Sequence, residues 1–266
     1  MDKGRLYKEL CEDVQEHYIQ NQSKIETQAG KKVYMKWCED NKEVNLWTYW
    51  QGKSYLNPKI LLVGQDWGCT TDKAQKNVME NIRAINAGVS KRYMDGNDNS
   101  TDKLLSHLFT ELGYNDIINN QYQELFFTNL ILGYRSVGSS GGYDPCWITE
   151  TEYHFFGRLV QILQPKVILC LGRKTFEGVL SVYGKKSLIK NKDKYNDFIE
   201  DTNRNPVVLD SGIKVYALAH CGSMGTLNRV TAKPKSMDQG EKLQRKDWER
   251  ISMENPDIKY SGYSGL

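Results

Sequence analysis

The sequence predicts an α/β protein, specifically a three-layer α/β/α sandwich built on a short, four-stranded parallel sheet. Four short apolar runs, rich in β-branched and aromatic residues, alternate with stretches whose apolar residues recur at helical spacing. The runs lie at 59–64, 125–131, 166–172 and 214–219. The 266 residues are 39% hydrophobic, which is enough for one well-buried core. Strands that alternate with helices form parallel sheets covered on both faces.

The first part of the chain, residues 1–58, is expected to be a helical, aromatic-rich extension packed on this core. Residues 6–22 have the apolar spacing of an amphipathic helix. Residues 33–50 contain five aromatic side chains, namely Tyr34, Trp37, Trp47, Tyr49 and Trp50.

The core itself is predicted to span residues 59–232. Its strands are KILLVG, LFFTNLI, KVILCLG and KVYALA, in chain order. The helices between them are expected at 76–87, 101–112, 149–163 and 174–182, and a Gly/Ser-rich loop at 137–143. The remaining residues, 233–266, are polar and charged, so we expect either a terminal helix lying along the domain or a partly disordered tail.

Composition excludes several classes of protein. No run approaches the roughly 20 apolar residues of a membrane span, and the first residues lead into a charged helix, so we expect a cytoplasmic protein without membrane contact. The six cysteines stand singly, with no C-x-x-C pair and no Cys/His cluster at zinc spacing. We therefore expect no structural metal, disulfide or cofactor.

The net charge of +3 is too small by itself to indicate a nucleic-acid partner. Basic residues nevertheless cluster in two places. Residues 173–194 contain seven lysines and arginines against two acidic residues, and a second basic stretch runs over 229–246. Each stretch fits either a nucleic-acid contact or an ordinary solvated face.

Polar residues gather where the four predicted strands end. GQDWG (64–68) follows the first strand, Asn129 lies in the second, and Arg173 and Lys174 follow the third. His220 follows the fourth strand. Because ligands of parallel sheets bind at the carboxyl ends of the strands, a carboxylate, an amide, a basic pair and a histidine should converge on one edge.

These four strand ends together resemble the uracil-DNA glycosylase superfamily. GQDWG looks like the family's water-activating motif, and FFTNLI is similar to the strand whose asparagine reads the base. QPKVILCLG resembles the family's K-P-K-V-I-x-x-L-G strand, and ALAHCGS is similar to its histidine motif. The four motifs occur in the family's order and cover roughly residues 59–229.

The resemblance implies a uracil-DNA glycosylase-like fold and the activity of a monofunctional DNA glycosylase, namely base flipping followed by hydrolysis of the N-glycosidic bond. Asp66 would position or deprotonate the attacking water, and His220 would donate a hydrogen bond to the carbonyl oxygen of the departing base. Asn129 would bind the edge of a uracil-like ring, and Gln65, Trp67 and Gly68 would complete the base pocket.

The resemblance also implies how DNA would bind to a monomeric enzyme. Met224 would fill the gap left by the flipped base, with Leu227 as the alternative. Gly222 and Ser223 would approach phosphates. Arg173 and Lys174 would hold the flanking phosphates.

Several alternatives remain open at this point. Trp67 and Cys221 stand where family members carry proline, which leaves a non-catalytic nucleic-acid-binding module of the same fold as one alternative. Gly68 replaces the tyrosine that excludes 5-substituted pyrimidines, so a second alternative is a glycosylase acting on bulky modified bases of phage DNA in antiviral defence. The iron–sulfur branch of the superfamily places four cysteines around this core, and none of the six cysteines here falls at a matching position. Cys146 is the nearest candidate. We therefore expect a protein without an iron–sulfur cluster, which would be colourless.

A purely structural role is also possible for each of the three main site residues. Asp66 fits a helix N-cap, His220 fits a structural histidine, and the amide of Asn129 fits either a structural partner or a ligand. A Rossmann-like small-molecule enzyme is disfavoured because the sequence has no G-x-G-x-x-G after its first strand and no P-loop signature.

Overall fold

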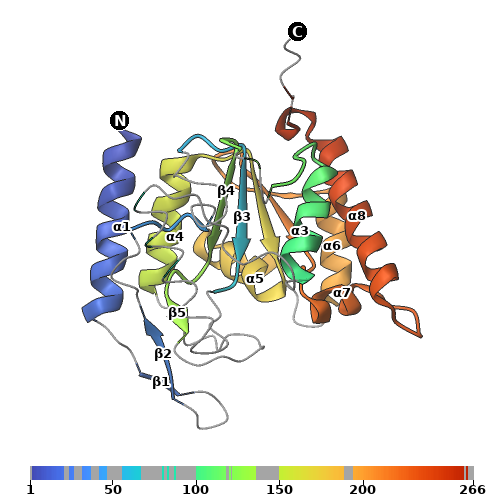
Figure 1. The fold of residues 1–266 in the computed structure, drawn as a ribbon, viewed down its shortest axis with the longest axis horizontal. Helices are drawn as coiled ribbons and strands as arrows, with labels where there is room; N and C mark the ends of the chain where they lie inside the picture. Colours follow the sequence, from blue (N-terminus) through green and yellow to red (C-terminus); the bar gives the residue numbers. More distant parts are fainter. Residues whose placement is uncertain are drawn as a thin grey trace.

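The structure is a computed structural model of the chain. It describes residues 2–20, 24–26, 32–36, 42–46, 56–66, 80, 83, 87, 100–117, 120, 122–135, 150–188, 194–260 and 262. The prediction of an α/β fold is confirmed: a five-stranded, mostly parallel sheet is surrounded by helices (Figure 1). No helix in the described ranges is long and apolar enough to cross a membrane.

The main sheet has the strand order β4-β3-β6-β8-β7. Its four parallel strands are β3 (Ile60–Gly64), β4 (Leu125–Asn129), β6 (Val167–Leu171) and β8 (Lys214–Leu218), which match the four predicted runs. The fifth strand, β7 (Val207–Val208), was not predicted and pairs antiparallel with β8. A strand of two residues is too short to leave a periodic signal in the sequence.

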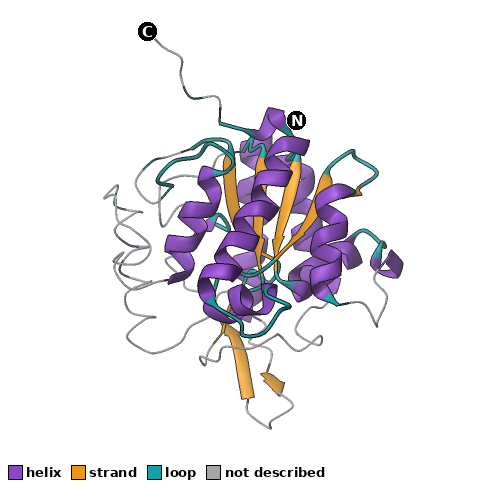
Figure 2. Cartoon of the chain, turned by 90° about the vertical axis from the view of Figure 1, so that its right-hand side faces the viewer, coloured by secondary structure: helices purple, strands orange, loops and turns teal. Residues whose placement is uncertain are grey.

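Alternate residues of the buried strands face two separate clusters. Leu61, Val63 and Ile168 pack under α1 (Lys3–Gln20), α4 (Glu150–Leu163), α5 (Arg173–Val182) and α6 (Tyr195–Arg204). Ile60, Leu62 and Leu169 face α3 (Ser100–Thr110) and α8 (Met237–Glu254). Figure 2 shows the strands between these helices. A sheet covered on both faces explains why its strands read as nearly continuous apolar runs.

The N-terminal part is not purely helical. The predicted first helix is present as α1, but β1 (Lys24–Glu26) and β2 (Lys32–Lys36) follow it and form a small antiparallel sheet with β5 (Tyr134–Arg135). The described residues 42–46 then run beside β4, the edge strand of the main sheet. There the hydroxyl of Thr128 donates to the carbonyl oxygen of Val44 at 2.9 Å, and the backbone N–H of Phe127 donates to Asn45 Oδ1 at 3.4 Å.

The polar C-terminal segment contains a helix that belongs to the core. The hydroxyl of Ser236 caps α8 by accepting from the N–H of Gln239 at 3.2 Å. Trp248 of α8 is only 1% exposed and packs edge-on against Phe109 of α3, with ring centroids 4.9 Å apart. A short 3₁₀ turn (Pro256–Ile258) follows. The first of the two expectations for this segment, a helix along the domain, is therefore the observed one.

Two further predictions fall outside the described part of the chain. The expected helix at 76–87 is covered only at residues 80, 83 and 87, and the Gly/Ser-rich loop at 137–143 is not covered. The structure therefore tests neither.

Candidate functional site

The candidate site lies at the carboxyl edge of the main sheet, where the strand order changes direction. After β3 the chain forms β4 on one side of β3, and then crosses to form β6 on the other side. Loops that leave a parallel sheet in opposite directions open a crevice between them, which is where ligands bind in open α/β folds. The arrow of β3 in Figure 1 points to this edge, and α7 (Ser223–Arg229) lies at the same edge.

Gln65 and Asp66 follow β3 directly, at the carboxyl edge of the sheet. Both residues are half-buried, and the side-chain amide of Gln65 donates to Asp66 Oδ2 at 2.9 Å. The carbonyl oxygen of Gln65 also accepts from the N–H of Ile131 at 3.1 Å, which extends the β3–β4 pairing beyond the strands. These bonds hold the carboxylate in place at the sheet edge. A helix capped by Asp66 would begin at residue 67, and residues 67–79 lie outside the described part of the chain, so the N-cap interpretation is not tested.

Asn129 is the last residue of β4 and lies directly beside Gly64 of β3. It is only 4% exposed, and we find no hydrogen bond to its side-chain amide within the described ranges. A Cβ atom at Gly64 would lie 2.3 Å from Asn129 Oδ1, so the amide occupies space that only glycine leaves open. The amide of Asn129 therefore keeps hydrogen-bonding capacity that a ligand at this edge can use.

His220 follows β8 and carries a defined hydrogen bond. The backbone N–H of Gly222 donates to His220 Nδ1 at 2.9 Å. A ring nitrogen that accepts is unprotonated, so the neutral ring carries its proton on Nε2 and can donate from there. His220 is an exposed residue, yet the protein atoms around its ring partly desolvate it and lower its pKa, against the opposing effect of the Asp66 charge. The site therefore favours a neutral donor.

Asp66, Asn129 and His220 lie at one edge of the sheet, at the ends of β3, β4 and β8. Gly172 follows β6, the strand between β3 and β8, and a Cβ atom at Gly172 would lie 3.9 Å from the Cβ of His220. Neighbouring strands are about 4.8 Å apart, so β3 and β8 flank β6 at about 10 Å from each other. A planar ring placed over the end of β6 would have a carboxylate on one side and a histidine donor on the other.

The remaining predicted site residues have different surroundings. Trp67 and Gly68 lie outside the described residues. Arg173 and Lys174 begin α5, and both contact Glu177: Arg173 Nε lies 2.5 Å from Oε1 and Lys174 Nζ lies 3.5 Å from Oε2. These two cations share one carboxylate, which reduces the positive charge available for phosphates.

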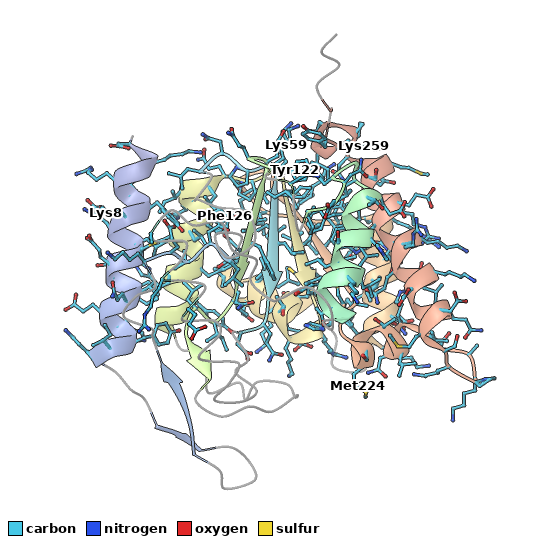
Figure 3. All side chains as sticks on the ribbon, viewed as in Figure 1. Lys8, Lys59, Tyr122, Phe126, Met224 and Lys259 are labelled. Carbon is cyan, nitrogen blue, oxygen red and sulfur yellow. The ribbon has the colours of Figure 1, made fainter. Side chains whose placement is uncertain are left out.

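Gly222 and Ser223 stand at the start of α7, which carries the two candidate wedge residues. Met224 is 68% exposed, whereas Leu227 is only partly exposed. Figure 3 shows Met224 at the end of the molecule opposite Lys59, the residue that precedes β3. The structure thus presents Met224 rather than Leu227 at the carboxyl edge.

Sequence reasoning missed one carboxylate near this edge. Asp102 lies in the first turn of α3, where acidic residues are common, so nothing in the sequence distinguishes it. In the fold, α3 starts against the His220 loop: a Cβ atom at Gly222 would lie 3.5 Å from Thr101 Oγ1. Burial raises the pKa of Asp102 to about 6. Burial, and to a smaller extent the charge of Asp102, also raises the pKa of the Cys221 thiol.

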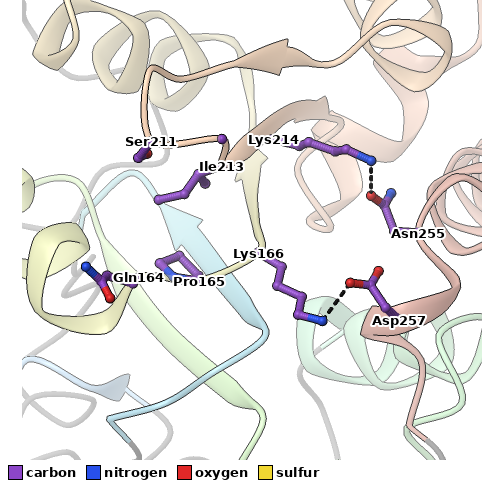
Figure 4. A pocket seen from close by; sticks show the side chains of 9 residues that line it. Gln164, Pro165, Lys166, Ser211, Ile213, Lys214, Asn255 and Asp257 are labelled. Atoms are coloured by element: carbon purple, nitrogen blue, oxygen red, sulfur yellow. Dashed lines mark hydrogen bonds and ion pairs between the residues drawn. The ribbon is translucent and has the colours of Figure 1, made fainter.

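A cavity of about 510 Å³ lies at the opposite, amino edge of the sheet (Figure 4). Its two lysines already have partners. Lys166 Nζ lies 2.6 Å from Asp257 Oδ2, and Lys214 donates to Asn255 Oδ1 at 2.9 Å. These contacts tie the starts of β6 and β8 to the end of α8, which is a structural role.

Neither a metal-binding group in the described residues nor a match to a known protein identifies the site further. Among the residues that the structure describes, no group of three or more His, Cys, Asp or Glu side chains could hold a metal ion. Cys146 lies outside those residues, so the iron–sulfur comparison stays untested. The fold and site define an α/β protein with polar side chains at the carboxyl ends of its parallel strands. No protein-family model matches the chain, and no curated protein matches it either.

Proposed function

We propose that this protein is a monofunctional DNA glycosylase, which flips a uracil-like or modified pyrimidine out of DNA and hydrolyses its N-glycosidic bond. One observation supports the proposal: a carboxylate, an amide and a histidine donor follow or end three parallel strands, β3, β4 and β8, at the same edge of one sheet. The resemblance of the four strand ends to the uracil-DNA glycosylase superfamily supports the same function.

The chemistry of the bond explains why these three groups are needed. Breaking a glycosidic bond leaves a cation-like sugar and an anionic base, so negative charge must face the sugar and donors must face the base. Asp66 supplies the charge and orients water for attack on the sugar carbon. Its bond from Gln65 keeps the carboxylate in place without neutralising its charge.

His220 and Asn129 act on the base. Because Gly222 fixes the acceptor at Nδ1, Nε2–H of His220 donates to the carbonyl oxygen on which negative charge develops. A neutral donor suits this role, since it stabilises the departing anion without giving up a proton. The Asn129 amide offers one donor and one acceptor, which match the edge of a pyrimidine ring.

Excision assays on labelled oligonucleotides test the proposal. The substrates carry uracil, hypoxanthine or a 5-modified pyrimidine, and hot alkali reveals abasic sites. Asp66→Asn and His220→Gln should each lower the excision rate by about 10²-fold or more. Asp210→Asn and His107→Gln replace exposed residues of the same types and should leave the rate unchanged. DNA binding without excision of any substrate would instead indicate a non-catalytic module.

The same panel addresses the substrate range. Gly68 predicts a pocket that admits 5-substituted pyrimidines, and excision of 5-hydroxymethyl or glucosylated pyrimidines would support a role in defence against phage DNA. Activity confined to unsubstituted uracil would exclude that role and support repair of deaminated cytosine.

A further inference from the structure

Helix α7 is held on α8 by a buried ion pair. Arg229, at the end of α7, is 5% exposed and donates to both carboxylate oxygens of Asp247 in α8, at 2.8 and 2.9 Å. Arg229 also contacts Glu200 of α6. A helix of seven residues is too short to be stable alone, so these contacts determine where α7 lies.

The two helices also approach each other closely at a glycine. A Cβ atom at Gly240 of α8 would lie 2.2 Å from the carbonyl oxygen of Thr226 in α7. Beside this contact, the side chain of Gln244 donates to Thr226 Oγ1 at 2.9 Å. Met224, which is exposed, therefore stands on a helix with a fixed position.

Exposed lysines without acidic partners follow α7. In the basic stretch 229–246, Arg229, Lys242 and Arg245 have carboxylate partners. Lys233 and Lys235, in the loop between α7 and α8, are exposed and have no acidic partner among the described residues. Asp238, the acidic residue nearest to them in sequence, is already paired with Lys242 at 2.8 Å.

This loop lies at the carboxyl edge. The end of α8 reaches the amino edge, where Asn255 accepts from Lys214 at the start of β8. The 18 residues of α8 extend about 27 Å, so its start and the preceding loop lie toward the other edge, as does α7 (Figure 1).

We propose that α7 and the loop 230–236 form a rigid surface that binds duplex DNA, in which Lys233 and Lys235 contact backbone phosphates beside the nucleotide displaced by Met224. The inference rests on the proposed function. In it, Lys233 and Lys235 are the main phosphate contacts in place of Arg173 and Lys174, which are paired with Glu177. Lysines without acidic partners, on the loop that follows a fixed helix with an exposed apolar residue, suit a phosphate backbone beside an opened base step.

The salt dependence of duplex binding tests the lysines. The variant Lys233→Ala/Lys235→Ala is compared with Lys8→Ala/Lys259→Ala, which removes two exposed lysines outside both basic stretches. All measurements use uracil-containing duplex and the Asp66→Asn background, so that the substrate stays intact. Each lost phosphate contact lowers the slope of log affinity against log salt by about 0.9, so the first variant should lose about 1.8 and bind about 60-fold more weakly at about 0.1 M salt. The control should match the parent.

An unchanged slope in Lys233→Ala/Lys235→Ala, with normal excision by the parent, would overturn this inference and leave the glycosylase proposal intact. Absence of any DNA binding by the parent would overturn both. Because these lysines are exposed loop residues, their replacement does not endanger folding.

A glycine variant tests the mounting of α7. Gly240→Ala forces α7 away from α8, and should lower duplex excision at least tenfold more than excision from single-stranded DNA, where no base pair is opened. Gly157→Ala is the matched control, since a Cβ atom there meets only an ordinary contact of 3.5 Å. Equal losses on both substrates would show that the position of α7 serves stability alone.

Discussion

Removing the carboxylate of Asp247 should destabilise the protein strongly. In Asp247→Ala, the guanidinium of Arg229 remains buried but loses both bonds to Asp247, and the side-chain amide of Asn203 loses its acceptor at 3.0 Å. Glu200 remains as a partner on the other side of Arg229. Breaking a buried pair by removing one partner costs about 3–5 kcal/mol, and Glu200 keeps the expected loss near the lower end, about 3 kcal/mol.

Urea unfolding followed by tryptophan fluorescence measures this loss, since Trp248 is buried on the same helix. Asp238→Ala is the matched control, because it removes an exposed ion pair from α8 and should cost about 0.5 kcal/mol or less. A loss below about 1 kcal/mol in Asp247→Ala would refute the reasoning. It would mean that Arg229 finds water or another partner when Asp247 is gone.

Three further predictions concern the site. Gly64→Ala places a Cβ atom 2.3 Å from Asn129 Oδ1 and should lower excision by about 10²-fold in the assay above, whereas Gly157→Ala should not. Asp102→Asn should stabilise the protein by about 1–2 kcal/mol at pH 7. Because the folded state raises the pKa of Asp102 from 3.8 to about 6, the parent protein loses stability as pH rises through this range, and the asparagine variant does not. Thermal melts should therefore show no gain below about pH 4, where the carboxyl group is protonated in both states. NMR titration of the His220 ring should give a midpoint below 6.5. Because the folded state disfavours the protonated ring, the contribution of His220 to folding stability should fall as pH drops below 6.5. A midpoint above 6.5 would contradict the proposal that His220 acts as a neutral donor.

The sequence was informative where a residue's role depends on its own strand. The four buried strands were predictable because both faces of the sheet are covered and their residues are apolar throughout. The positions of Asp66, Asn129 and His220 followed from the rule that parallel strands end at one edge. β7 and the small antiparallel sheet were missed, since their strands are short and are defined by partners distant in sequence.

Charge pairing was the part that sequence could not supply. Arg173 and Lys174 looked like phosphate ligands, but a single turn of helix brings Glu177 beside both. Arg229 looked like part of a basic stretch that either binds nucleic acid or faces solvent, yet its partner Asp247 lies 18 positions later on another helix. Such contacts depend on how helices pack, and periodicity does not record which helices are neighbours.

The segment at residues 42–46 has a consequence for solubility. β4 is an outer strand of the main sheet, and an uncovered outer strand offers free backbone groups to any other strand. Asn45 and Val44 occupy that side of β4 through their bonds to Phe127 and Thr128. We expect a shortened chain that lacks residues 1–46 to self-associate through β4. In the full chain, residues 44 and 45 prevent this by occupying the edge of the strand.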